Sequence, residues 1–427
     1  MAFVTLGRMP PTAAPAAAPA LAPAAEPPAS RMSPGLVVLL LALLLGIQPV
    51  TTDLYLPALP ALTAGFGAPM GQAQLTLSAL LLAFGCSQLV LGPLSDRFGR
   101  RPVLLWGLAA YVIASIGGAV AASIELLIVW RTLQGAAMGA AVMAGRAIVR
   151  DLYQPADGAR MMSRALTGLG LIACACAPVG GLVSDLFGWR MALAVPALFG
   201  ALALALVWLR FDESLVRRNP DALRLPALAA TWAMVLRHPT FRAFSALTTA
   251  AYGLLFTFLA ASSFVFIQVL GLSKTQYGLV MLWNSVAYIA GTFVCRRWLP
   301  RFGVRGSVAR AAWLTLAGGT AMGLLALAGV HTVWAIVAPA TLTMLAHGVH
   351  QPCGQTGAVG PFPQAAGAAS AINGFLMMLA AFGIGGWLGA RMDGTVLPLA
   401  LGTWFWSVCI ALVAWTLVRR HGEPHGH

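Results

Sequence analysis

Two charged residues stand inside apolar segments that are long enough to cross a membrane. Asp53 lies in the motif TTDLYLPALP, and it is the one acid of its apolar run. Arg131 lies in a second motif, RTLQG. A carboxylate or a guanidinium in hydrocarbon is costly unless it is paired or faces water, so each is a candidate functional residue. An acid in that setting can hold a proton or bind a ligand, and a nearby arginine can neutralise it.

The depths of these two residues predict that they pair. At 1.5 Å per residue, Asp53 lies roughly 15 Å and Arg131 roughly 10 Å from the same end of their predicted helices. No other acid stands at a matching depth in the neighbouring apolar runs. We therefore expect an Asp53–Arg131 ion pair. Two alternatives stay open: Asp53 could be solvated near the membrane surface, and Arg131 could extend its side chain to that surface.

The composition predicts a membrane protein. Of its 427 residues, 59% are hydrophobic and 9% are charged, whereas about 25% of a soluble domain is charged. The net charge of +14 does not indicate a nucleic-acid partner, because the basic residues lie in short segments between long apolar runs. Six scattered cysteines exclude a disulfide scaffold. We expect no cofactor and no metal site, since His347, His350 and Cys353 form too small a ligand set.

Twelve apolar runs are each long enough to cross about 30 Å of hydrocarbon as a helix. We therefore predict an all-α polytopic membrane protein with two pseudo-symmetric six-helix bundles, at 34–211 and 239–418, joined by a cytoplasmic loop at 212–238. The ends, 1–33 and 419–427, are predicted tails, the first disordered because it is rich in alanine and proline. The predicted spans are 35–63, 72–94, 102–121, 124–149, 161–184, 189–211, 241–268, 275–298, 305–329, 332–355, 365–389 and 394–418.

The distribution of basic residues predicts the orientation, and internal repeats support the two halves. With the N-terminus inside, the inside segments carry 21 arginines and lysines and the outside segments carry 3, which indicates that both termini are cytoplasmic. The segment DRFGRR at 96–101 recurs as PRFGVR at 300–305, and PVGGLV at 178–183 recurs loosely as GIGGWL at 383–388. Two matches at nearly one offset indicate a duplicated six-helix unit, an arrangement typical of transporters.

The segment between the second and third spans reads GPLSDRFGRR. Its glycines permit a tight turn, and its acid can accept hydrogen bonds from a helix N-terminus or pair with an arginine. In a plainer interpretation, its three arginines only hold the loop inside. The spacing resembles the loop signature of the major facilitator superfamily, which implies a conformational latch between inward- and outward-facing states. The candidate latch residues are Gly92, Asp96, Arg97, Gly99 and Arg100; in the second copy, Pro300 replaces Asp96.

Three further sets of residues are candidates for the transport path. In the fifth span, a proline and two glycines predict a bend and close helix contact. At the inner end of the fourth span, two arginines and an acid form either an inner gate or an anchor at the membrane surface. Aromatic and amide side chains could line an apolar cavity, or pack in the core or face lipid. The sets are Pro178, Gly180 and Gly181; Arg146, Arg150 and Asp151; and Tyr55, Gln134, Tyr252, Phe256, Trp283 and Asn284.

Over about residues 35–418 the chain resembles the bicyclomycin/chloramphenicol-resistance (Bcr/CflA) group, in the drug:proton antiporter branch of the major facilitator superfamily. The resemblance rests on TTDLYLPALP, GPLSDRFGRR, RTLQG with RAIVRD, and FTFLAASSFVFI. It rests only partly on the proline–glycine motif, where Ala173 and Ala177 replace two usual glycines.

This resemblance implies proton-driven efflux of small drug-like molecules by a monomer in a bacterial inner membrane, with the proton gradient as the energy source. By position, it implies that Asp53 responds to protons and substrate, and that Arg131 is the arginine of the fourth span's motif. Leu45 stands where some multidrug relatives carry a second acid.

Two other functions stay open. An uptake symporter for a metabolite would use the same fold. A polytopic membrane enzyme would need convergent nucleophile, base or metal groups, and most of the twelve acids lie in loops. The residues themselves do not decide between efflux and uptake.

Overall fold

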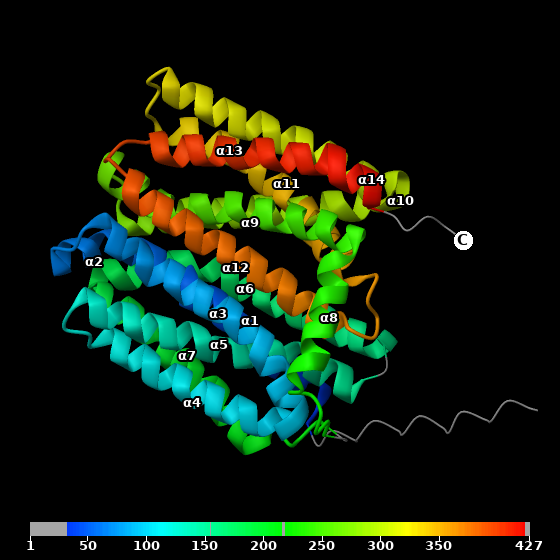
Figure 1. Ribbon diagram of the computed structural model, residues 1–427. Coiled ribbons are helices and arrows are strands. Elements are labelled where there is room, and N and C mark those ends of the chain that lie inside the picture. The colour runs from blue at the N-terminus through cyan, green and yellow to red at the C-terminus, as the bar shows by residue number, and fades with distance from the viewer. Residues whose placement is uncertain (1–31, 154, 216–217, 423–427) are drawn as a thin grey trace, which may run out of the picture.

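The chain forms long helices that lie side by side (Figure 1). The computed structural model describes residues 32–153, 155–215 and 218–422, so most of the tail predicted at 1–33 lies outside the described residues. The elements are α1 (Pro34–Thr52), η1 (Leu56–Ala58), α2 (Leu59–Phe66), α3 (Met70–Phe98), α4 (Arg100–Ala119), α5 (Ile124–Leu152), α6 (Pro155–Phe187), α7 (Trp189–Arg210), α8 (Leu225–Arg237), α9 (Pro239–Phe264), η2 (Val265–Val269), α10 (Lys274–Leu327), α11 (Val333–Val359), α12 (Ala366–Arg391), α13 (Leu397–Val413), η3 (Ala414–Val418) and α14 (Arg419–His421).

In the part of the chain that the structure describes, twelve helical stretches could cross a membrane once the double helix α10 is divided. Among the described residues, 11 helical stretches are long and apolar enough to cross a membrane. One of them, α10, has a non-helical residue inside it: Gly303, at φ 63° and ψ −175°. Its counterpart in the first copy of the repeat, Gly99, has φ 108°. Glycine reaches positive φ without a Cβ clash, so both copies of the repeat join two spans through a glycine.

The first span is broken near its middle. Helix α1 ends at Thr52, and the chain resumes as η1 and α2. Pro57 and Pro60 lie just after the break, and a proline ring cannot donate the backbone hydrogen bond that a continuous helix needs. The break leaves Asp53 at the C-terminal end of α1, where backbone carbonyls lack helical partners.

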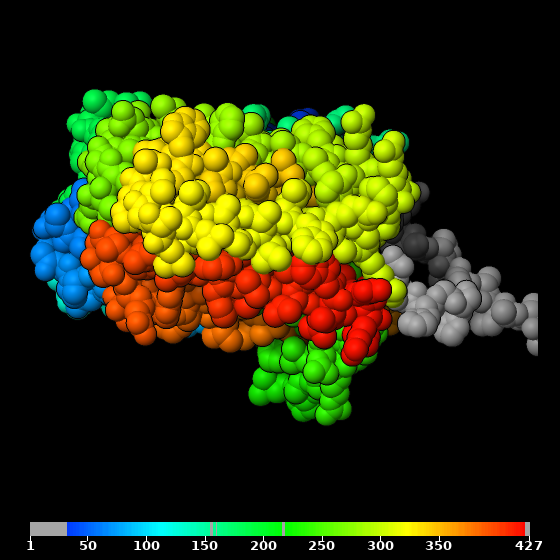
Figure 2. Space-filling model, turned by 90° about the horizontal axis from the view of Figure 1, so that it is seen from above, coloured from blue at the N-terminus to red at the C-terminus, as the bar shows by residue number. Residues whose placement is uncertain are grey.

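The bundle has two ends, which we name by their composition. The arginine-rich end holds the α3–α4 junction, and the opposite end holds the α6–α7 junction. Helix α8 crosses the arginine-rich end at a steep angle to the spans (Figure 1) and projects from the body of the molecule in green in Figure 2. The sequence predicted a loop here. The structure instead has a helix with exposed Leu225, Met234 and Leu236.

The helices α1–α7, here the N-terminal half, pack on α9–α14, the C-terminal half. The contacts run between α3 and α12, between α6 and α10, and between the broken first span and α9. Small residues allow the close approach: Gly181 lies against the backbone of Lys274 and Thr275, and Gly278 lies against that of Ala177. The interface therefore surrounds the break that carries Asp53.

Candidate functional site

Asp53 faces the interface between the halves. Its side chain is half-buried, and its carboxylate accepts a hydrogen bond from Thr52 Oγ1 at 2.8 Å. The carboxylate is within electrostatic range of Tyr252 on α9, Tyr277 on α10 and Cys176 on α6. Asp53 therefore lies near groups of both halves.

Arg131 is the centre of a buried network inside the N-terminal half. It is 1% exposed, so the alternative in which its side chain extends to the membrane surface is wrong. Its guanidinium donates to the Thr51 carbonyl at 3.1 Å, the Thr76 carbonyl at 3.3 Å and Gln134 Oε1 at 2.8 Å. It also lies 4.4 Å from the centre of the Tyr55 ring. The Thr51 carbonyl belongs to the last turn of α1, so Arg131 caps the helix at its break.

Further hydrogen bonds tie this network to α4. Thr51 Oγ1 donates to the Ile47 carbonyl, so the Tyr111 hydroxyl, 2.6 Å away, donates to Thr51. Gln134 Nε2 donates to Ser115 Oγ at 2.7 Å. The network therefore fixes α1, α3, α4 and α5 around a cation that is stabilised by neutral acceptors. It places Tyr55 and Gln134 against Arg131 rather than on a cavity wall.

The predicted ion pair between Asp53 and Arg131 is wrong. Among the described residues, Arg131 has no carboxylate within 4.0 Å. The reason is the rotation of the chain about the axis of the span. Although α1 ends at Thr52, Asp53 and Tyr55 keep right-handed helical backbone angles. Thr51 and Tyr55, four residues apart, therefore lie on the side toward Arg131, whereas Asp53, two residues from each, lies on another side.

The candidates on α9 and α10 divide between the interior and the surface. Tyr252 and Phe256 are buried with nearly parallel rings, 6.4 Å apart and inclined by 13°. Asn284 is 4% exposed, and neither atom of its amide has a partner in the structure. Trp283 does not line a cavity: it is 53% exposed and donates from Nε1 to Thr341 Oγ1 at 2.9 Å. Being one residue from Asn284, it points about 100° away around the helix.

The latch candidates form an ion-pair network at the arginine-rich end. Arg100 pairs with Asp96 at 2.6 Å and with Asp151 at 2.9 Å. The sequence predicts an inner-gate role for Asp151, but the structure places its carboxylate in the latch network, because α5 ends beside the start of α4. Arg97 stays outside the network, with its guanidinium 5.6 Å from the Phe98 ring centre.

A residue that the sequence did not single out completes this network. Glu213, after α7, accepts from the backbone N–H groups of Arg100 at 2.8 Å and Arg101 at 3.2 Å. A carboxylate at a helix N-terminus satisfies unpaired donors and complements the helix dipole. Nothing in the local sequence marked Glu213, because its partners lie more than 100 residues earlier.

The hydrogen bonds between the halves are unevenly distributed. Among the described residues, one lies at the arginine-rich end, from Arg146 to Ser370 Oγ at 3.1 Å. Of the other two inner-gate candidates, Arg150 is exposed and Asp151 belongs to the latch network. Arg146 therefore supplies the one hydrogen bond that joins the halves at this end among the described residues.

The opposite end is joined more extensively. Asp185 on α6 pairs with Lys274 on α10 at 3.6 Å and accepts from Thr275 Oγ1 at 2.7 Å. Gln74 on α3 donates to the carbonyl of Ala260 on α9 at 2.8 Å. The helix-bend candidates lie here: Pro178 is inside α6, Gly180 lies against the backbone of Leu54, and Gly181 lies against α10. The two halves are closed together at this end.

The sequence comparison decides the family. Residues 41–386 match the Major Facilitator Superfamily. The chain belongs to the Major Facilitator Superfamily. It is therefore a multi-pass membrane transporter, and the family points away from an enzyme.

Several of the curated relatives are drug-resistance proteins. The chloramphenicol resistance protein of Pseudomonas aeruginosa is 28% identical over 346 residues, covering 80% of this chain and 81% of that protein. Multidrug resistance protein D of Escherichia coli (strain K12) is 27% identical over 345 residues, covering 80% and 85%. A bicyclomycin resistance protein homolog of Haemophilus influenzae is 28% identical over 267 residues, covering 62% and 67%. These similarities confirm the resemblance to the Bcr/CflA group.

Solved structures confirm the fold. A partially occluded inward open structure of the xylose transporter XylE from E. coli has a TM-score of 0.72 at 15% identity, covering 92% of this chain and 99% of that one. The human organic anion transporter MFSD10 has a TM-score of 0.58 at 20% identity, covering 91% and 100%. At these identities the likeness shows the fold alone.

Proposed function

We propose that this transporter exports small amphipathic drug-like molecules across a bacterial inner membrane in exchange for protons, with both termini in the cytoplasm. The names of its relatives support drug export. One observation carries the proton coupling: Asp53, the one acid of its span, lies half-buried at a helix break between the halves and has no cation within 4.0 Å among the described residues.

An acid that has no ion-pair partner can exchange a bound proton for a substrate, because no ion pair has to break first. When Asp53 is ionised, its carboxylate is held by the Thr52 hydroxyl and can accept a hydrogen bond from a substrate. When it is protonated, it loses its charge and one oxygen becomes a donor, so it accepts a hydrogen bond from the substrate more weakly and the carboxyl group is neutral. Proton and substrate then compete for one carboxylate, and such competition across two conformations produces exchange.

The substrate's other contacts come from the C-terminal half in this proposal. The Tyr252 and Phe256 rings provide apolar area, and the buried amide of Asn284 offers one acceptor and two unused donors. Arg131 is occupied by its own network and supplies a fixed positive charge to the N-terminal half. We therefore expect neutral or weakly charged substrates rather than dications.

Alternation between the two ends completes the cycle. The contacts of Asp185 with Lys274 and Thr275 must separate for the opposite end to open. The Asp96–Arg100–Asp151 network keeps α3, α4 and α5 together as one body while the halves move. Loss of the Asp96 charge should therefore slow turnover without preventing insertion.

Direction and coupling can be tested together. A drug-sensitive bacterial host should become more resistant to several amphipathic drugs when it expresses the protein. Right-side-out vesicles should extrude a fluorescent drug when their exterior is acidified, and should stop when the pH gradient is collapsed. Accumulation driven by the same gradient would mean uptake symport, and drug extrusion that survives its collapse would contradict proton coupling.

A further inference from the structure

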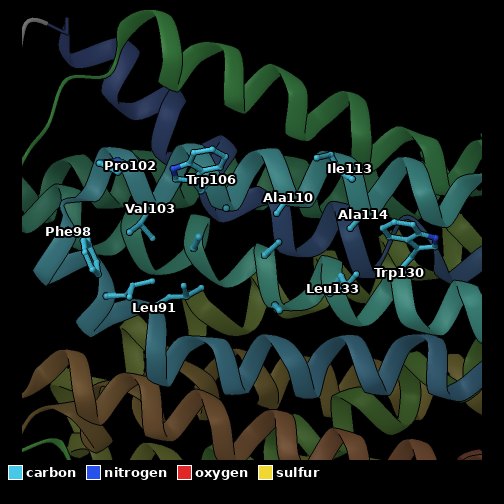
Figure 3. Close-up of a pocket in the computed structure, with 15 residues that line it drawn as sticks. Leu91, Phe98, Pro102, Val103, Trp106, Ala110, Ile113, Ala114, Trp130 and Leu133 are labelled. Carbon is cyan, nitrogen blue, oxygen red and sulfur yellow. The ribbon is translucent and has the colours of Figure 1, made fainter. Parts of the chain in front are cut away.

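A hollow lies on the outer surface of the N-terminal half, between α3, α4 and α5 (Figure 3). Its volume is about 700 Å³. Gly107 on α4 lies against Ala140 on α5, and this close contact makes a floor of small residues. Phe98, Trp106 and Trp130 stand along its sides. Trp106 is 78% exposed, so the groove opens toward the surroundings of the bundle.

The groove lining suits a hydrocarbon chain. Its residues are leucines, alanines, valine, isoleucine, proline, glycine, phenylalanine and two tryptophans, without a hydroxyl, carboxamide or charged side chain. A ligand that buried hydrogen-bonding groups here would leave most of them unpaired, at a cost. An acyl chain has no such groups, so the lining favours a lipid over a drug.

The length and depth of the groove match one membrane leaflet. The groove extends from Pro102 near the arginine-rich end to Ala114 on the same helix (Figure 3). Twelve residues of helix rise about 18 Å, which is a little more than half of the roughly 30 Å hydrocarbon core. A chain lying in the groove would begin at the membrane surface and end near the midplane.

A cation stands at the membrane-surface end of the groove. Arg97 is exposed, and its guanidinium lies over the ring of Phe98, a residue of the groove. The Asp96–Arg100–Asp151 network does not include Arg97, so its charge is available to a ligand. A phosphate is the partner that a guanidinium prefers at such a position.

We propose that this groove binds one anionic glycerophospholipid, with an acyl chain along α4 and α5 and its phosphate at Arg97. The proposal does not depend on drug export. It adds a lipid site beside the latch, since Arg97 follows Asp96 directly in the chain. Anionic lipid bound there would restrain the α3–α4 junction.

The pseudo-symmetric copy supplies a matched control. Arg301 and Phe302 correspond to Arg97 and Phe98 in the repeat, and Arg301 is also exposed. There, however, the ring of Phe302 is covered by Arg310, at 3.5 Å. Arg301→Gln therefore removes an equivalent charge away from the groove.

The test measures lipid retained by the full-length protein in detergent, by native mass spectrometry. Phosphatidylglycerol and phosphatidylcholine with identical chains are each added at the same molar excess. Ala110→Phe fills the groove, since Ala110 is exposed within it; Ala205→Phe is its control on the exposed face of α7. Ala137→Leu is a second groove-filling variant if Ala110→Phe does not fold.

We expect the wild type to retain one phosphatidylglycerol in preference to phosphatidylcholine. Arg97→Gln should reduce that preference about fivefold, the factor for about 1 kcal/mol per basic residue at an anionic surface. Groove filling should reduce retention of both lipids, while Ala205→Phe and Arg301→Gln should behave as wild type.

Three results would overturn the proposal. Equal retention of the two lipids by the wild type would contradict the contact between the lipid headgroup and Arg97. Unchanged lipid retention after groove filling would contradict binding of an acyl chain in the groove. A drug whose binding is lost in Ala110→Phe while lipid retention is unchanged would show that the groove takes drug instead.

Discussion

Arg100 is predicted to be the residue on which the stability of the latch depends most. Its side chain is 5% exposed and bridges two acids that differ in environment: Asp151 is 14% exposed and Asp96 is 46% exposed. We therefore expect Arg100→Gln to destabilise the protein most, Asp151→Asn less and Asp96→Asn least.

The magnitudes follow from burial. Arg100→Gln leaves Asp151 partly buried without its cation, and breaking a buried pair costs about 3–5 kcal/mol; because the network lies at the end of the bundle, we expect about 3. Asp151→Asn removes one charged hydrogen bond, worth about 1.5–3 kcal/mol. Asp96→Asn removes a solvent-screened pair, worth about 1 kcal/mol or less.

Unfolding of the three variants in one detergent, followed by tryptophan fluorescence, measures these differences. The same preparations in proteoliposomes give turnover, which Asp96→Asn should slow although it barely changes stability. The reasoning is refuted if Asp96→Asn destabilises as much as Asp151→Asn, or if Arg100→Gln lies within about 1 kcal/mol of wild type. Unchanged turnover in Asp96→Asn would show that the loop only sets orientation.

Two further predictions concern the network and the interface. Arg131→Lys keeps the charge, but a compact ammonium cannot donate to three acceptors that are placed for a planar guanidinium. The free energy of unfolding should therefore fall by about 2–4 kcal/mol. A loss below about 1 kcal/mol in the same unfolding assay would contradict the network. In Gly181→Leu, the new side chain would meet the backbone of α10, so drug transport should stop while expression continues. The control is Gly386→Leu, at the matching position of the repeat, where a Cβ meets nothing within 4 Å; equal loss in both would point to a general folding defect.

Sequence reasoning located the spans because each needs only a long apolar run, and it located the interhelical glycines because a tight junction needs one. It failed where rotation around a helix decides the outcome. Depth along the helix axis predicted that Asp53 lies beside Arg131. Asp53, however, lies on another side of its span than Thr51 and Tyr55, which contact Arg131. The same error put Trp283 in the interior with Asn284.

Other features were missed because they depend on distant segments. Helix α8 was hidden because the polar residues around it dominate the 212–238 segment. Glu213 was not marked because its role depends on the start of α4. The Arg131 network was partly visible, through Arg131, Gln134 and Tyr55, but Thr76 and Tyr111 carry no motif that distinguishes them from other span residues.

Proton release on drug binding tests the central claim, that Asp53 exchanges a proton for substrate. The purified protein is placed in weakly buffered detergent solution with a pH indicator, and a neutral amphipathic drug is added. The wild type should release protons in proportion to bound drug. Asp53→Asn should still bind the drug, because the amide keeps a hydrogen-bonding group at the site, but it should release none. If Asp53→Asn releases as many protons per bound drug as the wild type, Asp53 is not the coupling acid and the proposed exchange is wrong.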